Sequence, residues 1–73
     1  QELEVGYVHI GADSMIAYNA CILPNVTIGR HCFVGALSVV NRDIHPYSVA
    51  VGAPARVVKQ YDFNQGEWVR VYG

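Results

Sequence analysis

A branched aliphatic residue recurs at every sixth position through the middle of this chain, at Ile10, Ile16, Ile22, Ile28, Val34 and Val40. The residue after each aliphatic is mostly small. The fifth position of each repeat is mostly small as well, and is filled by Ser14, Ala20, Val26, Cys32, Ser38 and Ile44. A period of six matches neither an amphipathic helix nor a simple alternating strand. It predicts a solenoid in which each repeat forms one short flat side and a turn.

The repeat also predicts how the sides stack. Three sides of this length close a triangular coil of about 18 residues, and successive coils stack about 4.8 Å apart with parallel hydrogen bonding. The aliphatic and the small fifth residue both point inward. The expected stacked pairs are Ile10 with Ile28, Ile16 with Val34, and Ile22 with Val40. The register alone leaves the handedness of the coil open.

The pattern divides the chain into a coiled part and a tail. Residues 10–45 hold two regular coils, and residues 1–9 are expected to form a frayed or edge coil. Pro46 and Tyr47 then form a corner, SVAV forms another side, and a turn at 52–54 ends the coiling. Residues 64–66 predict a turn in an extended or hairpin tail. We therefore expect an all-β fold with a short β-helical domain at 1–58 and a tail at 59–73.

Composition excludes several classes of protein. A net charge of −1 and the lack of a basic stripe argue against a nucleic-acid binder, and a hydrophobic content of 52% argues against disorder. No apolar run approaches the roughly 18 residues of a membrane span, and no signal peptide is recognisable. The chain begins at Gln1 rather than Met, which we interpret as a segment removed or lying upstream.

The cysteines and histidines lack the spacing of metal ligands. Cys21 and Cys32 are interpreted as reduced structural residues of a cytoplasmic protein, with Cys32 acting as a small inward hydrophobe. A stack of few coils exposes both of its ends, and short solenoids need caps or partners. We therefore expect a homo-oligomer.

Three stretches carry a resemblance to a known family. They are ILPNVTIGRHCFVGALSVVNRDIHPYS, VAVGAPARVVK and the tail YDFNQGEWVRV. The first two resemble the coil, basic-acidic corner and terminating segment of the hexapeptide-repeat acyltransferases, and the tail is similar to those of sugar and polysaccharide O-acetyltransferases. The resemblance implies a left-handed parallel β-helix, against the usual right-handed crossover. It also implies a trimer with acetyl-coenzyme A bound in the cleft between neighbouring prisms.

Matched positions imply a set of cofactor-binding residues, which are Gly35, Ala36, Asn41, Arg42, Gly52, Arg56 and Lys59. The backbone at Gly35 and Ala36 lines the pantetheine groove in this comparison. The polar and basic members lie near the coenzyme's phosphates, where charge-assisted hydrogen bonds would hold them. Each cation could instead be a solvated surface charge, and Arg42 could pair with Asp43 or stack on Tyr47.

The chain departs from the family in three ways. Met15 stands where the family usually has Trp, and Tyr18 occupies a position that is commonly small. The catalytic His of the family lies in an upstream Gly/His segment, which residues 1–9 do not match. His9 is the one N-terminal candidate for the general base, with an exposed strand-end His as the alternative. His31 and His45 are interpreted as corner residues.

Two functions from different classes follow. The first is an acetyl-coenzyme A-dependent O-acyltransferase acting on a sugar or polysaccharide hydroxyl, with this chain as its C-terminal, cofactor-binding portion. Missing upstream coils or a partner chain would then supply the base. The alternative is a truncated, non-catalytic β-helix that serves as an oligomerisation or scaffold module. The aromatic residues of the tail could stack on a sugar ring, or pack on the prism or on a neighbouring chain.

Overall fold

The computed structural model describes residues 7–71, and all regular structure in that range is β. Six two-residue strands follow the six-residue period: β1 (His9–Ile10), β2 (Met15–Ile16), β3 (Cys21–Ile22), β4 (Thr27–Ile28), β5 (Phe33–Val34) and β6 (Val39–Val40). Three longer strands follow, which are β7 (Ser48–Val51), β8 (Arg56–Asp62) and β9 (Glu67–Arg70). The all-β prediction is confirmed for these residues.

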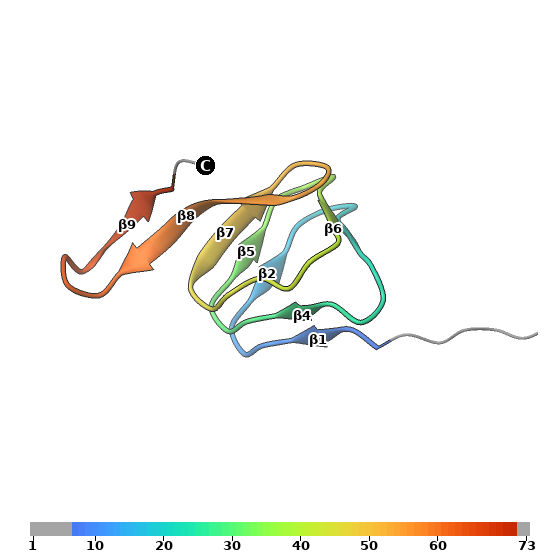
Figure 1. Ribbon diagram of the computed structural model, residues 1–73, viewed down its shortest axis with the longest axis horizontal. Coiled ribbons are helices and arrows are strands. Elements are labelled where there is room, and N and C mark those ends of the chain that lie inside the picture. Colours follow the sequence, from blue (N-terminus) through green and yellow to red (C-terminus); the bar gives the residue numbers. More distant parts are fainter. Residues whose placement is uncertain (1–6, 72–73) are drawn as a thin grey trace, which may run out of the picture.

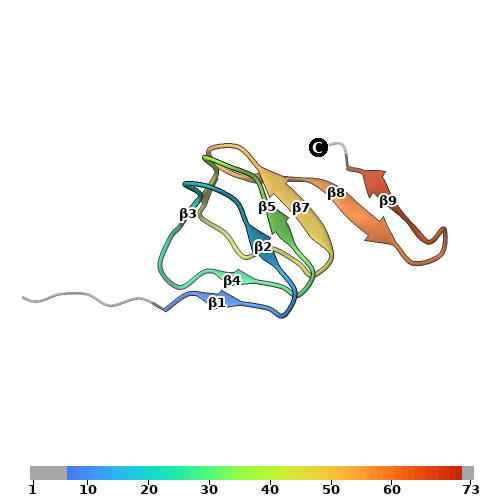
Figure 2. The same ribbon diagram turned by 180° about the vertical axis from the view of Figure 1, so that it is seen from behind.

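Strands three repeats apart pair in parallel, so the chain returns to the same side after each coil. β1 pairs with β4, β2 with β5, and β3 with β6. The register confirms the three stacked pairs expected from the sequence: Ile10 with Ile28, Ile16 with Val34, and Ile22 with Val40. Figure 1 shows the sides as a triangle, with β1 and β4 on one side and β2, β5 and β7 on another. Figure 2 shows β3 on the remaining side.

The last coil is shorter than the ones before it. Ile44 bridges to Ile28, and Val49 pairs with Phe33, so both pairs are 16 residues apart instead of the 18 that separate Ile10 from Ile28. The expectation that Ile44 fills the fifth position of a sixth regular repeat is therefore wrong. Ile44 takes the first position of the next side, because the corner after β6 lacks two residues.

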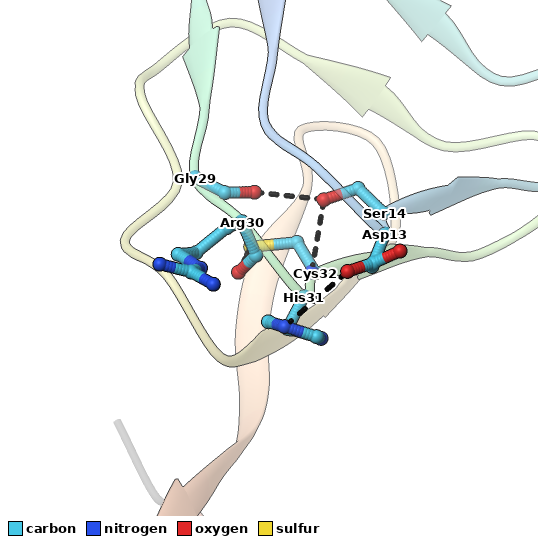
Figure 3. Close-up of polar contacts among 6 residues, drawn as sticks. All are labelled: Asp13, Ser14, Gly29, Arg30, His31 and Cys32. Carbon is cyan, nitrogen blue, oxygen red and sulfur yellow. Dashed lines mark hydrogen bonds and ion pairs between the residues drawn. The ribbon is translucent and has the colours of Figure 1, made fainter.

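The core runs along the axis of the triangle. Its buried apolar members are Val26, Ile28, Cys32, Val34, Val40, Ile44 and Ala50. Fifth-position residues therefore face inward, as predicted. Small polar residues there are hydrogen-bonded: the hydroxyl of Ser14 donates to the Gly29 carbonyl at 2.8 Å and accepts from the Cys32 amide at 3.1 Å (Figure 3). These bonds join one coil to the next.

One residue at each corner except the shortened one after β6 has a left-handed backbone, a feature that the sequence analysis did not identify. Positive φ values occur at Asp13, Asn19, Asn25, His31, Leu37 and Tyr47. Asp, Asn and His tolerate this conformation. Leu37, with φ of 62°, and Tyr47, with φ of 60°, are the unfavourable members, since bulky side chains rarely adopt this conformation.

The tail extends one side of the triangle. β7 pairs in parallel with β5, β8 pairs antiparallel with β7, and β9 pairs antiparallel with β8, which gives a five-stranded sheet in the order β2-β5-β7-β8-β9. The turn between β8 and β9 contains Gly66 with φ of 69°, so the predicted hairpin is confirmed. β8 starts at Arg56 and crosses the domain boundary expected at 58 and 59. In Figure 1 the outer end of the hairpin projects away from the triangle.

Aromatic residues of the hairpin pack on the corner that precedes β7. Phe63 lies edge-on to Tyr47, with ring centroids 4.9 Å apart, and Tyr61 lies 6.3 Å from Tyr47. The Tyr61 amide also donates to the Tyr47 carbonyl at 3.0 Å. Of the alternatives for these aromatics, packing on the chain's own prism is therefore observed for Tyr61 and Phe63.

Candidate functional site

A cleft of about 490 Å³ opens between the shortened corner and the start of β8. The corner contributes Asn41, Arg42, Asp43 and Ile44, and the facing segment contributes Pro54, Ala55, Arg56 and Val57. Two guanidinium side chains from separate segments thus border one cleft. The Asp43 carboxylate is held by the Thr27 amide, which donates to its Oδ1 at 2.8 Å.

The turn at residues 52–55 leads into the segment that forms one wall of the cleft. Hydrogen bonds to β6 and to the corner before it hold this turn in place. The Gly52 amide donates to the Ser38 hydroxyl at 3.1 Å, the Val39 amide donates to the Gly52 carbonyl at 3.0 Å, and the Ala55 amide donates to the Val39 carbonyl at 2.8 Å. Gly52 has φ of 102°, which side-chain-bearing residues rarely adopt. Its role in the structure is therefore to allow this turn.

A bulge in β8 turns Arg56 and Lys59 toward the same face of the sheet. Arg56 pairs with Val51 and Lys59 with Val49, and the register shifts between Val49 and Ala50. Residues three apart in a regular strand point to opposite faces, and an extra residue restores a common side. Val49 and Val51 are two residues apart, so Arg56 and Lys59 lie about 7 Å apart along the strand. Because Ala50 is buried and Val51 is exposed, this common face is the outer one.

Gly35 borders the same outer face. A Cβ added to Gly35 would lie 2.7 Å from Cγ1 of Val51, so the close packing of these two residues requires glycine. The Gly35 amide donates to the Ala50 carbonyl at 2.9 Å, and the following Ala36 is exposed. Gly35 itself is buried beneath Val51, the partner of Arg56, so this segment reaches the outside at Ala36.

The structure brings three of the four sequence-predicted polar and basic residues together and leaves one apart. Asn41, Arg42 and Arg56 share the cleft. Lys59 does not line the cleft and lies on the adjacent outer face. Among residues 7–71 the ion-pair distances include none between Arg42 and Asp43, and Tyr47 stacks on a histidine rather than on Arg42.

The histidines of the described residues lie outside the lining of the cleft. His9 is exposed on β1 opposite Thr27, and the Thr27 amide in turn contacts Asp43. Two strand spacings of about 4.8 Å therefore separate His9 from the corner that borders the cleft. His31 stacks on Tyr47 with ring centroids 4.8 Å apart. The structure places none of these histidine side chains in the cleft.

The ring of His31 also faces Asp13, with Nε2 to Oδ2 at 3.6 Å (Figure 3). The side chain of His45 is exposed, and its carbonyl accepts a hydrogen bond from the Cys32 thiol at 3.0 Å. Both contacts lie at one corner of the triangle. They support structural roles for the two histidines, as the sequence indicated.

Sequence reasoning missed Arg70, which the hairpin places directly opposite Lys59. The signal for it was the position of the predicted turn, because residues equally distant from the centre of a hairpin turn face each other. In the part of the chain that the structure describes, no group of three or more His, Cys, Asp or Glu side chains could hold a metal ion. The same residues form no helix long and apolar enough to cross a membrane.

Comparison with known proteins identifies the repeat. Residues 7–42 match the family described as bacterial transferase hexapeptide (six repeats). The chain is a hexapeptide-repeat protein of this family. A Staphylococcus aureus (strain COL) protein that carries an acetyltransferase name is 44% identical over 59 residues, which cover 81% of this chain and 30% of that protein.

Solved structures give the same result for the fold. A maltose O-acetyltransferase from Clostridium difficile 630 superimposes with a TM-score of 0.75 at 44% identity, covering 78% of this chain and 30% of that one. A galactoside acetyltransferase in complex with coenzyme A superimposes with a TM-score of 0.74 at 33% identity, covering 90% and 35%. This hexapeptide-repeat chain thus spans about a third of the length of these relatives.

Proposed function

We propose that this chain is the cofactor-binding portion of an acetyl-coenzyme A-dependent O-acyltransferase whose acceptor is a sugar or polysaccharide hydroxyl. The proposal includes a left-handed parallel β-helix, a trimeric assembly and a cytoplasmic location. The observation that carries it is the cleft that Arg42 and Arg56 both line. Its support from the comparisons is the similarity to an acetyltransferase that binds coenzyme A.

The cleft suits a phosphate group for electrostatic reasons. Guanidinium groups form paired, charge-assisted hydrogen bonds with phosphate oxygens. Arg42 and Arg56 approach from facing walls, and the amide of Asn41 adds a neutral donor. The Asp43 carboxylate accepts from the Thr27 amide, which gives it a partner other than the two arginines. The diphosphate of the coenzyme is the group assigned to this cleft.

The exposed Ala36 beyond the cleft suits the thiol arm. Gly35 is buried, but Ala36 is exposed and carries only a methyl group, so an extended ligand can lie close to the chain at Ala36. Val51 lies between Gly35 and Arg56 on the same face. A ligand held by its phosphates at Arg56 can therefore run along the outer face past Val51 toward Ala36.

The reaction needs a general base that removes the proton of the acceptor hydroxyl as its oxygen attacks the thioester carbonyl. The new C–O bond forms, the C–S bond breaks, and the coenzyme leaves as a thiol after taking up a proton. His9 lies outside the cleft. We therefore assign the base to a residue outside this chain, on further coils or on a partner chain.

Calorimetric titration of the full chain with coenzyme A tests the proposal. Replacing either arginine, as Arg42→Ala or Arg56→Ala, should weaken binding by about 10- to 100-fold, since a hydrogen bond to a charged group contributes about 1.5–3 kcal/mol. Arg30→Ala is the matched control, because Arg30 is an exposed arginine that does not line the cleft. Equal effects of all three substitutions would contradict the assignment.

The second candidate is a scaffold module without catalytic activity. It is favoured by the exposure of Ile10, which is 48% exposed although its repeat position points inward. An uncovered apolar end suits association with another chain. A folded oligomer that shows no coenzyme binding at millimolar ligand would support the scaffold and end the acyltransferase proposal for this chain.

A further inference from the structure

Backbone hydrogen bonds between the first two coils follow a regular order on the side that carries β1 and β4. The His9 amide donates to the Val26 carbonyl at 3.2 Å, and the Gly11 amide donates to the Ile28 carbonyl at 2.8 Å. Every second amide of one coil thus donates to a carbonyl of the next coil, as in an ordinary parallel ladder. This order predicts which carbonyls should accept from the amides of the second coil.

The ladder continues from the second coil to the shortened corner through Ile44. This residue bridges to Ile28, its amide donates to the Thr27 carbonyl at 2.9 Å, and its carbonyl accepts from the Gly29 amide at 2.8 Å. These two bonds repeat the order of the first two coils. They fix the register in which the rest of the corner can be compared with the coil before it.

One bond of the repeated ladder is made by a side chain. In this register Arg42 stands where Val26 stands one coil earlier, so the Arg42 carbonyl is the expected acceptor for the Thr27 amide. The Thr27 amide donates instead to Oδ1 of Asp43, at 2.8 Å. The carboxylate of Asp43 therefore takes the place of a backbone carbonyl in the ladder.

The exchange matters because the two counterpart side chains lie in opposite environments. Val26 points inward and is 4% exposed. A guanidinium group in the same position would be a buried charge without a partner, which is strongly unfavourable. Arg42 is instead exposed, and it lines the cleft together with Asn41.

We propose that Asp43 is a positioning residue of the cleft, whose carboxylate replaces the ladder carbonyl and so lets the backbone at Arg42 turn the guanidinium group outward. Asp43 acts through Arg42 and needs no contact with a ligand. The inference rests on the proposed function, because the outward guanidinium group serves to bind an anion. The carboxylate also has a cost, since it places a negative charge in the lining of a cleft assigned to a diphosphate.

Two substitutions of Asp43 remove the same charge and differ in the acceptor. Asp43→Asn keeps a side-chain oxygen that can accept from the Thr27 amide, whereas Asp43→Ala has none. Charge alone would make both variants bind an anion more tightly. The positioning role separates them: Asp43→Asn should bind coenzyme A as tightly as the unaltered chain or up to about 5-fold more tightly. Asp43→Ala should bind it about 10-fold more weakly, because Arg42 loses its charge-assisted contact.

Calorimetric titration of the full chain measures these affinities at a temperature at which every variant is folded. Ser14→Ala is the matched control, because the Ser14 hydroxyl also accepts from a backbone amide of the neighbouring coil, that of Cys32 at 3.1 Å, and does not line the cleft. It should lower the melting temperature and leave the affinity unchanged. In an Arg42→Ala background, Asp43→Ala should cause no further weakening, since the arginine that it positions is absent.

Hydrogen exchange at the Thr27 amide tests the replaced bond without any ligand. The protection of this amide should fall in Asp43→Ala and persist in Asp43→Asn. Full protection in Asp43→Ala would show that another acceptor takes over, and the inference would then be wrong whatever the affinities.

Three binding results would also overturn the inference. Equal affinities of the two Asp43 variants would show that the acceptor oxygen makes no difference. An equal loss in Ser14→Ala would assign the effect to general destabilisation, and a further loss in the Arg42→Ala background would show that Asp43 does not act through the arginine.

Inorganic diphosphate serves as a second probe in the same titrations. If the unaltered chain binds diphosphate but not coenzyme A, the proposed function fails, and the comparison of the two Asp43 variants on diphosphate still decides the positioning role. If the folded chain binds neither probe, the proposed function and the positioning role both fail.

Discussion

Replacement of Leu37 by asparagine should stabilise the protein. Leu37 has φ of 62° at a corner where the equivalent positions carry Asn and Asp at similar angles. A left-handed backbone costs a residue with an ordinary side chain about 1–2 kcal/mol. Asparagine tolerates this region because its short polar side chain forms local hydrogen bonds.

The loss of apolar contact offsets part of this gain. Leu37 is 67% exposed, so about a third of the roughly 1.5–3 kcal/mol available from burying a leucine is lost. The net gain is therefore about 0.5–1 kcal/mol. For a domain of this size it corresponds to a rise in melting temperature of about 2–8 °C.

Thermal unfolding followed by circular dichroism measures this shift. Leu23→Asn is the matched control, because Leu23 is 38% exposed and does not have a positive φ. It should lower the melting temperature. If both substitutions lower the melting temperature by similar amounts, the reasoning from corner strain is refuted.

Three further predictions concern packing and hydrogen bonding. Gly35→Ala should destabilise by about 1–3 kcal/mol through the contact with Val51, and the added change Val51→Ala should recover part of this loss in urea unfolding. Ser14→Ala should cost about 1 kcal/mol or more, since two backbone groups lose their partner, and a cost near zero would show that water replaces the hydroxyl. Ile28→Ala should cost about 2–5 kcal/mol of stability, because Ile28 is 1% exposed. Ile10→Ala should cost clearly less, because Ile10 is 48% exposed, and equal losses in the same unfolding assay would contradict the predicted stacking.

The coil was predictable from the sequence because one inward position per side fixes the register. Once Ile10, Ile16 and Ile22 are assigned to different sides, closure after three sides follows, and so do the partners of these residues. The hairpin was predictable for a similar reason. A turn at 64–66 determines which residues of β8 and β9 face each other.

The shortened corner was not predictable in the same way. Ile44 is apolar, and an apolar residue fits both the first and the fifth position of a repeat. Only the bridge between Ile44 and Ile28 shows which position it takes. This corner is part of the site, because its residues Asn41 and Arg42 line the cleft together with Arg56.

The bulge in β8 has the larger consequence for function. Read as a regular strand, the sequence Arg-Val-Val-Lys places its two cations on opposite faces, and a single ligand could not contact both. One extra residue brings Arg56 to the outer face together with Lys59, and the hairpin then adds Arg70. Charges placed together in this way oppose folding through their mutual repulsion. A bound anion reverses that effect, so coenzyme A should raise the melting temperature of the chain, and more so at low ionic strength, where the contacts between phosphates and cations are least screened.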